Sequence, residues 1–325
     1  MSATEPLPYY YRLSAPAGHY ELAALEFRAL TGDGMPGPIP RVGIGEEAGL
    51  QRIFRARLGV DVARSAYVAE CSRLLVEAAG LEELLGSAEK LALRRDRFRV
   101  TVRTTGDVAA PETGQIERAV ADIIEGSPDL SRPATEMTVT GAPEGWLLGE
   151  LVSRTGNRWQ GHEQRPFQYS SALPPRVARA LVNLVAVPGD KLIDPCCGVG
   201  TALVEASEIG IEAFGWETNP VVAEHAAANI CHHNQGASIV VGDGRKARGR
   251  WHGAVLDLPY GQQSVKVDSV CAGLVECTGE VADLIAVVAL DDLTGLLESL
   301  SFNLLGVAEL RKNKLVRRVH WAQKV

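Results

Sequence analysis

The sequence predicts an α/β protein whose C-terminal half forms a doubly wound sheet of seven strands, the last two antiparallel, behind an α+β region. Two observations carry this prediction. From Pro188 onward, short apolar runs alternate with segments of helical periodicity, which is the pattern of a parallel sheet covered by helices. A glycine-rich turn at residues 194–201 follows the first of these runs, where a strand would enter its helix.

The elements of the C-terminal half follow in order. Apolar runs predict strands at residues 191–193, 213–216, 238–241, 253–256 and 284–290, and a closing hairpin at 302–310 and 315–322. Helical periodicity predicts helices at 201–209, 220–232, within 271–282 and at 291–300, the last with Asp291 or Asp292 near its N-cap.

The N-terminal half is less regular. Its patterns predict strands at residues 9–13, 97–103, 136–139 and 145–151, and helices at 21–30 and 115–124. A Gly/Pro-rich loop occupies 32–40, the segment 64–90 is ambiguous at its start and helical at its end, and 154–167 is polar and irregular. We therefore expect an N-terminal region over 1–155, a linker over 156–170 and a second domain over 171–325.

Composition narrows the class of protein. With 325 residues, 46% of them apolar, the chain can bury full cores and is not a largely disordered protein. It shows no secretory signal and no apolar run near the ~18 residues that span a bilayer, so we expect a cytoplasmic protein without membrane contact. The six cysteines form no spaced framework and are expected to be reduced. The oligomeric state stays open, with a monomer as one option.

Two features could bind a metal or a nucleic acid. In Cys231-His232-His233, two adjacent histidines on one helix point apart, so we expect no metal site. The net charge of −7 argues against coating of nucleic acid by bulk charge, but it permits local recognition. Basic residues cluster at two places, each either a recognition surface or a solvated face: Arg94, Arg95, Arg97, Arg99 and Arg103, and Lys312, Lys314, Arg317 and Arg318.

The strongest motif is Asp-Pro-Cys-Cys-Gly-Val-Gly-Thr at residues 194–201. Its two glycines allow a sharp turn and close approach to a ligand, and the following helix presents free N–H groups to a carboxylate. A carboxylate at the end of the strand would repel a pyrophosphate but suits the ammonium of a methionine moiety. We expect cofactor-binding residues at Asp194, Cys196, Gly198, Gly200 and Thr201.

Two further carboxylates follow the next predicted strands. Glu217 ends the second strand, where an acidic residue normally accepts hydrogen bonds from ribose hydroxyls. Asp243 ends the third, where it can reach an adenine amino group. Carboxylates at the ends of three successive strands favour an adenosine ligand.

The fourth strand ends in Asp257-Leu258-Pro259-Tyr260-Gly261, which faces the first motif across the switch point of the sheet. An exocyclic amine is a poor nucleophile because its lone pair is delocalised into the ring. The Asp257 carboxylate and a backbone carbonyl of Leu258 or Pro259 could each accept one N–H and localise that lone pair. Tyr260 offers a ring on which an extruded base can stack. Asp257, Pro259 and Tyr260 are the candidate catalytic residues.

The combination of these motifs resembles the class I amino-methyltransferases with a D/N-P-P-Y motif. It is most similar to the tRNA guanine-N2-methyltransferases with an N-terminal THUMP RNA-binding domain. Residues 165–179 resemble the element that leads into their catalytic domain, and 311–319 their closing hairpin. Residues 97–151 have the strand–helix–strand–strand order of a THUMP domain, behind a ferredoxin-like segment. Leu258 replaces the first Pro of the motif, and we expect activity to survive because the roles belong to the Asp, the backbone and the aromatic residue.

The resemblance implies a Rossmann-like, S-adenosylmethionine-dependent enzyme that methylates guanine N2 in tRNA, at position 10. Two alternatives stay open. The same loop chemistry serves a DNA methyltransferase acting on adenine N6 or cytosine N4. A non-catalytic RNA-binding protein with a decayed methyltransferase fold is the other, although the motif residues are intact.

Overall fold

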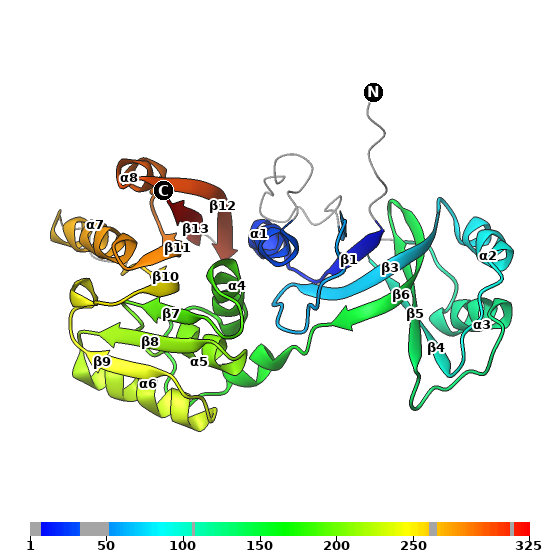
Figure 1. Cartoon of the computed structure of the whole chain (residues 1–325), viewed down its shortest axis with the longest axis horizontal. Coiled ribbons are helices and arrows are strands. Elements are labelled where there is room, and N and C mark those ends of the chain that lie inside the picture. The colour runs from blue at the N-terminus through cyan, green and yellow to red at the C-terminus, as the bar shows by residue number, and fades with distance from the viewer. Residues whose placement is uncertain (1–7, 33–51, 106–107, 260–264, 313–314) are drawn as a thin grey trace. The chain divides into compact units, whose positions relative to one another are not determined.

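The computed structural model describes residues 8–32, 52–105, 108–259, 265–312 and 315–325 (Figure 1). These residues form two compact units. The N-terminal unit holds 8–14, 52–63 and 68–155, and the C-terminal unit holds 15–32, 64–67 and 156–325. The domain limits expected from the sequence stay predictions.

The N-terminal unit is built on a six-stranded sheet in the order β2-β1-β3-β6-β5-β4. Its β4 and β5 are parallel and the other neighbours are antiparallel. The strands are β1 (Tyr9–Leu13), β2 (Ile53–Ala56), β3 (Val68–Ala78), β4 (Phe98–Thr104), β5 (Thr135–Ala142) and β6 (Gly145–Arg154), with helices α2 (Leu81–Lys90) and α3 (Thr113–Ile123). The ambiguous segment 64–90 thus contains a long strand and a helix, and β2 was not predicted.

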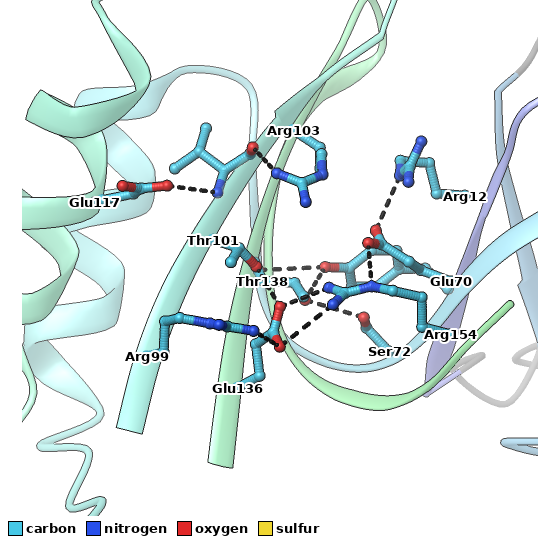
Figure 2. A network of polar contacts seen from close by, with 12 residues as sticks. Arg12, Glu70, Ser72, Arg99, Thr101, Arg103, Glu117, Glu136, Thr138 and Arg154 are labelled. Atoms are coloured by element: carbon cyan, nitrogen blue, oxygen red, sulfur yellow. Dashed lines mark hydrogen bonds and ion pairs between the residues drawn. The ribbon is translucent and has the colours of Figure 1, made fainter. Parts of the chain in front are cut away.

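The two faces of this sheet differ because side chains alternate along each strand. In β4, Phe98, Val100 and Val102 point into a core shared with Leu84 of α2 and Ile116 of α3. The residues between them belong to the opposite face, which carries the polar network of Figure 2 and a smaller apolar cluster that includes Tyr10, Ala142 and Leu147.

Two glutamates organise that polar face. Glu70 accepts hydrogen bonds from Arg12 and Arg154, at 2.9 and 3.0 Å. Glu136 accepts from Arg154 and Arg99, at 2.5 and 2.6 Å, and from the Thr101 hydroxyl at 2.8 Å. Arg154 therefore joins the two glutamates, and Figure 2 shows its guanidinium between them. Both oxygens of each of these two glutamates are therefore hydrogen-bonded to an arginine.

The C-terminal unit is built on a seven-stranded sheet in the order β12-β13-β11-β10-β7-β8-β9 (Figure 1). Strands β9, β8, β7, β10 and β11 run parallel, and β13 is antiparallel to both of its neighbours. The strands are β7 (Lys191–Asp194), β8 (Glu212–Glu217), β9 (Ser238–Val241), β10 (Trp251–Asp257), β11 (Ala282–Ala289), β12 (Phe302–Lys312) and β13 (Leu315–Lys324). The fold class expected from the sequence is confirmed, with a switch point between β7 and β10.

Helices cover this sheet on both faces, as the doubly wound pattern requires. They are α4 (Pro175–Val185), α5 (Thr201–Glu208), α6 (Pro220–His232), α7 (Val265–Gly279) and α8 (Thr294–Ser299). The sequence did not predict α4, although its inner face is fully buried. Within the part of the chain that the structure describes, no helix has the length and apolar content to cross a membrane.

Helix α1 (Tyr20–Thr31) belongs to the C-terminal unit, where it packs against α4 and β12. Its Glu26 is fully buried and accepts hydrogen bonds from the N–H groups of Ala66 and Tyr67 and from the Asn183 amide. These bonds, together with one from the Ser65 hydroxyl at 2.8 Å, fix the segment 64–67 to the helices of the C-terminal unit.

The segment expected to be an irregular linker is folded. Residues Arg158–Glu163 form a 3₁₀ helix in which Trp159 and His162 are buried. His162 Nδ1 lies 2.6 Å from Glu205 Oε1 of α5, and the buried Arg179 of α4 pairs with Glu205 and Glu208. These contacts bind the segment to the C-terminal unit.

Candidate functional site

A cavity of about 660 Å³ opens at the carboxyl ends of β7, β8, β9 and β10, beside the switch point of the sheet. Crossover connections bring these strand ends together at one edge. The cavity brings together most of the residues predicted from sequence: Asp194, Cys196, Gly198, Thr201, Glu217, Asp243, Asp257 and Pro259. Gly200 lies in the same turn without lining the cavity, and Tyr260 lies outside the described residues.

Two glycines shape the first loop. Gly198 and Gly200 have φ of +52° and +80°, which L side chains rarely adopt. A Cβ on Gly200 would lie 3.2 Å from the Ala226 side chain of α6, whereas one on Gly198 would meet nothing within 4 Å. A side chain at position 200 would therefore be strained by the backbone conformation and crowd α6, whereas Gly198 leaves space in the wall of the cavity.

Asp194 ends β7 and is 4% exposed. Its Oδ1 accepts a hydrogen bond from the Cys196 N–H at 3.1 Å. Burial raises the pKa of this carboxyl to about 8, and the nearby charges of Asp257 and Glu217 raise it further. A carboxyl in this environment favours a cationic ligand, because a positive charge would offset the burial of the ionised form.

Glu217 ends β8 and holds the first loop in place. Its Oε2 accepts the Gly198 N–H at 3.1 Å, and its Oε1 accepts the Asn219 N–H at 2.8 Å. The carboxylate thus ties the glycine turn to the start of α6. Each oxygen of Glu217 therefore already accepts one hydrogen bond within the protein, and the side chain also lines the cavity.

Asp243 follows β9 and is held by a neighbour that the sequence analysis did not consider. Arg245 donates to both carboxylate oxygens, with Nε at 3.0 Å from each and Nη2 at 2.6 Å from Oδ2. This guanidinium lowers the pKa of Asp243. Gly244 sits between them, and a Cβ there would lie 1.9 Å from the Pro195 carbonyl oxygen, so this loop packs directly on the first motif.

Asp257 ends β10 and, like Asp194, has a raised pKa. Burial raises its pKa to about 7, and the nearby Arg317 acts in the opposite direction. Arg317 Nη1 lies 3.8 Å from Asp257 Oδ1, and that oxygen has no hydrogen-bond partner among the described residues. Arg317 belongs to a basic cluster in the sequence, but its side chain is only 8% exposed and lies beside the cavity carboxylate.

The backbone after Asp257 explains the Leu258 substitution. The Leu258 N–H donates to Val288 O at 3.0 Å, continuing the pairing of β10 with β11, and the side chain is buried. A proline has no N–H to make this bond. The thiols of Cys196 and Cys271 donate to the carbonyls of Asp257 and Pro259, at 3.6 and 3.8 Å.

An aromatic group at the entrance of the cavity carries no role in the sequence analysis. Tyr169 lines the cavity, is 42% exposed, and forms a 2.8 Å hydrogen bond with His225 Nδ1. The same imidazole stacks on Phe167 with ring centres 3.8 Å apart, and Asn229 binds the Phe167 backbone through both N–H and C=O. The aromatic residues in 165–179 are the signal that could have identified this group.

Among the described residues, no cluster of histidine, cysteine or carboxylate side chains has the arrangement of a metal site. His162 and His233 lie with ring centres 4.7 Å apart, but Arg165 is close to His233 and opposes a cation there. Arg165 also donates to the Thr201 hydroxyl at 2.7 Å, so it fixes the start of α5.

Comparison with known proteins shows that part of this site is similar to a methyltransferase domain. Residues 162–247 match the family described as UPF0020: RMKL-like, methyltransferase domain. The matched segment contains the first loop and the ends of β7, β8 and β9. The methyltransferase prediction is confirmed at this level, and the prediction of S-adenosylmethionine as cofactor agrees with the fold and the family.

Three similar proteins extend the comparison. The chain is 28% identical over 264 residues to the tRNA (guanine(10)-N2)-dimethyltransferase of Methanothermobacter thermautotrophicus, which covers 75% of each protein. It is 29% identical over 163 residues to the enzyme of the same name from Pyrococcus abyssi, covering 47% of this chain and 49% of that protein. The crystal structure of TrmN from Thermus thermophilus aligns with 98% of this chain and all of its own, at 20% identity and a TM-score of 0.47. The resemblance to tRNA guanine-N2-methyltransferases, predicted from the motifs, is confirmed by the first two.

Proposed function

We propose that this protein transfers a methyl group from S-adenosylmethionine to the exocyclic N2 of guanine in tRNA, at position 10. The observation that carries the proposal is Asp257: a half-buried carboxylate at the switch point, with one oxygen that has no hydrogen-bond partner among the described residues, on the wall of a cavity whose first loops match a methyltransferase domain. The two relatives named tRNA (guanine(10)-N2)-dimethyltransferases support the substrate and the position.

The residues of the cavity fit the methyl donor. S-adenosylmethionine supplies a methyl group on a sulfonium centre, so the leaving group needs no further activation. Asp194 would hold the ammonium of the methionine moiety and Glu217 the ribose hydroxyls, with Gly198 giving close approach of the backbone. Asp243 would accept a hydrogen bond from the adenine amino group, either in addition to its bonds from Arg245 or after one of them is displaced. The convergence of buried carboxylates on one cavity favours a ligand that carries positive charge.

The loop after β10 supplies acceptors for the target amine. Asp257 would accept one N–H, and the Leu258 carbonyl would accept the other, because the thiol of Cys271 already donates to the Pro259 carbonyl. Two acceptors in fixed positions draw the lone pair out of conjugation and towards the donor. The methylated nitrogen carries one proton too many, and a carboxylate with a pKa near 7 is suited to take it. Stacking of the extruded base on Tyr260 belongs to the same proposal.

RNA binding by the N-terminal unit, as in a THUMP-containing enzyme, is part of the proposal, and so is the cytoplasmic location that a tRNA substrate requires. The basic cluster predicted for this role needs refinement. Arg94, Arg95, Arg97 and Arg99 pair with Glu125, Glu150, Asp129 and Glu136. Arg103 has no acidic partner among the described residues, and its guanidinium donates to the Val102 carbonyl. Exposed ion pairs are weak, so an RNA phosphate can compete with the acidic partners of these arginines. At Arg103 a phosphate would not have to displace an acidic partner among the described residues.

The test is transfer of a radiolabelled methyl group from S-adenosylmethionine to bulk tRNA, to DNA and to buffer alone. The proposal expects label in tRNA. Label in DNA would favour the adenine-N6 or cytosine-N4 alternative. No transfer by protein that binds S-adenosylhomocysteine and tRNA would favour the non-catalytic alternative.

A further inference from the structure

Arg317 lies on β13, in the closing hairpin, yet it reaches the catalytic edge of the sheet. Strand β13 pairs with β11 through Val319 and Val288, and Val288 pairs with Asp257 across the next ladder. Arg317 lies two residues before Val319 in β13, so the two side chains are on the same side of the sheet. Because β13 is antiparallel to β11, Arg317 lies towards the carboxyl end of β11. Its Nη1 reaches 3.8 Å from Asp257 Oδ1.

Burial makes this contact different from the other ion pairs of the hairpin. The side chains of Arg317 and Asp257 are 8% and 20% exposed. Arg318, the next residue, is 34% exposed and faces the other side of the sheet, where it donates to Leu290 O at 3.0 Å and lies 3.6 Å from Glu309. A charge interaction is screened much less in a buried site than at the surface, so Arg317 has a direct influence on Asp257 that Arg318 lacks.

We propose that Arg317 is a positioning residue that keeps the Asp257 carboxylate ionised and directed at the target amine. The inference rests on the proposed function, in which Asp257 accepts an amine N–H. A protonated Asp257 would lose half of that accepting capacity and could no longer take the proton released after transfer. A cation about 4 Å away favours the charged form against the burial that opposes it.

The titrations of other groups near Arg317 and Asp257 must be distinguished from the titration of Asp257. Asp194 and Cys196 face Asp257 from the first loop, and His19 lies near Arg317 at the start of α1. Burial lowers the pKa of His19 to about 4, so His19 is neutral from pH 6 upward. Burial keeps the Cys196 thiol protonated. Asp194, with a pKa raised to about 8, titrates in the same range as Asp257 and therefore needs its own control.

The test compares Arg317→Met, Arg317→Lys and the matched control Arg318→Met in single-turnover methylation of tRNA at saturating S-adenosylmethionine, from pH 6 to 9. For Arg317→Met, the acidic limb of the rate profile should move up by about one pH unit or more, giving a rate about tenfold lower at pH 6 and nearly unchanged at pH 9. Arg317→Lys should restore most of the wild-type profile, and Arg318→Met should leave it in place. A uniform loss at every pH, equal in Arg317→Met and Arg317→Lys, would show a structural role and overturn the proposal.

A second measurement does not depend on activity. Carboxyl ¹³C resonances of labelled aspartate, with Asp257 assigned from the spectrum of Asp257→Asn, report its titration in the full-length protein without substrate. The proposal expects the Asp257 titration to move upward in Arg317→Met while the Asp194 titration stays. An unmoved Asp257 titration would overturn it. If the titration moves but Asp257→Asn methylates tRNA normally, the proposed catalytic role of Asp257 fails instead.

Discussion

The two units of this protein use buried carboxylates in opposite ways. On the polar face of the N-terminal sheet, Glu136 has two arginines and a threonine hydroxyl, and these partners lower its pKa to about 2. In the C-terminal cavity, burial raises the pKa of Asp194 to about 8 and of Asp257 to about 7, and Asp257 Oδ1 lies 3.8 Å from Arg317 without a hydrogen-bond partner among the described residues. Glu136 is therefore paired within the protein, whereas Asp194 and Asp257 are left for a ligand, although Asp243 of the same cavity keeps Arg245 as its partner. The shortage of partners, more than burial alone, marks the functional site.

The largest effect is expected at Asp257. Asp257→Asn keeps the shape but replaces a charged acceptor by an amide that can also donate. We expect the single-turnover rate of tRNA methylation to fall by about 10²-fold or more, with little change in the affinity for S-adenosylhomocysteine. The control is Glu136→Gln, the same kind of change in a carboxylate that lies in the other unit, which should leave the rate unchanged. A wild-type rate in Asp257→Asn would reduce this loop to an ordinary turn.

The next effect concerns cofactor binding and pH. The Asp194 carboxyl must ionise to hold an ammonium, and its pKa in the unliganded protein is raised to about 8. Binding should therefore release a proton, and the affinity for S-adenosylhomocysteine should fall by up to about tenfold for each pH unit below 8. Calorimetry over pH 6 to 9 measures this dependence. Asp194→Asn should bind more weakly, with a flatter pH profile, and equal slopes in the two proteins would remove Asp194 from the ligand site.

The paired carboxylates should affect stability instead of activity. Glu136→Gln leaves Arg99 and Arg154 without a charged partner, so we expect the free energy of unfolding of the N-terminal unit to fall by about 1–3 kcal/mol. Because the folded pKa of Glu136 is lowered from 4.5 to about 2, its contribution is present above pH 4.5 and is lost as the pH falls through this window. Urea unfolding at pH 7 and pH 3 would measure the difference between variant and wild type, which should shrink at pH 3.

The smallest effect is expected in RNA binding. Arg103→Ala removes a cation that has no acidic partner among the described residues, whereas Arg94→Ala removes one already paired with Glu125. We expect Arg103→Ala to weaken tRNA binding a few-fold and to lower the salt slope by about 1, with a smaller change for Arg94→Ala. The full chain is needed, since a fragment from residue 165 would lack α1, which packs on α4. Equal, unchanged salt slopes would remove this surface from the proposed tRNA contact.

The sequence predicted most of the C-terminal fold because strand and helix periodicities are local. The loops between strand and helix were also predictable, since a carboxylate at a strand end and glycines such as Gly198 form a recognisable ligand-binding motif within one short segment. Helix α4 was missed because residues 165–179 were taken only as an element leading into the domain. The segment 154–167 was taken as a linker because the partner of His162, Glu205, is distant in sequence.

Contacts between residues distant in sequence were also the part of the site that could not be predicted. Arg317 stands among other basic residues and could not be distinguished from Arg318 until the strand order placed its side chain beside Asp257. The contact between Asp243 and Arg245 is local but depends on a turn that packs on Pro195. Motif position therefore predicted which residues line the cavity, and only the tertiary structure showed which of them are already paired.

The most direct test of the account is identification of the methylated nucleoside. Full-length protein, S-adenosylmethionine and a tRNA transcript with guanosine at position 10 would be incubated, digested and analysed by mass spectrometry, beside a transcript with adenosine at that position. The account predicts N2-methylated guanosine in the first transcript and none in the second, with Asp257→Asn producing far less. Methylation at a different atom, or equal methylation of both transcripts, would contradict it.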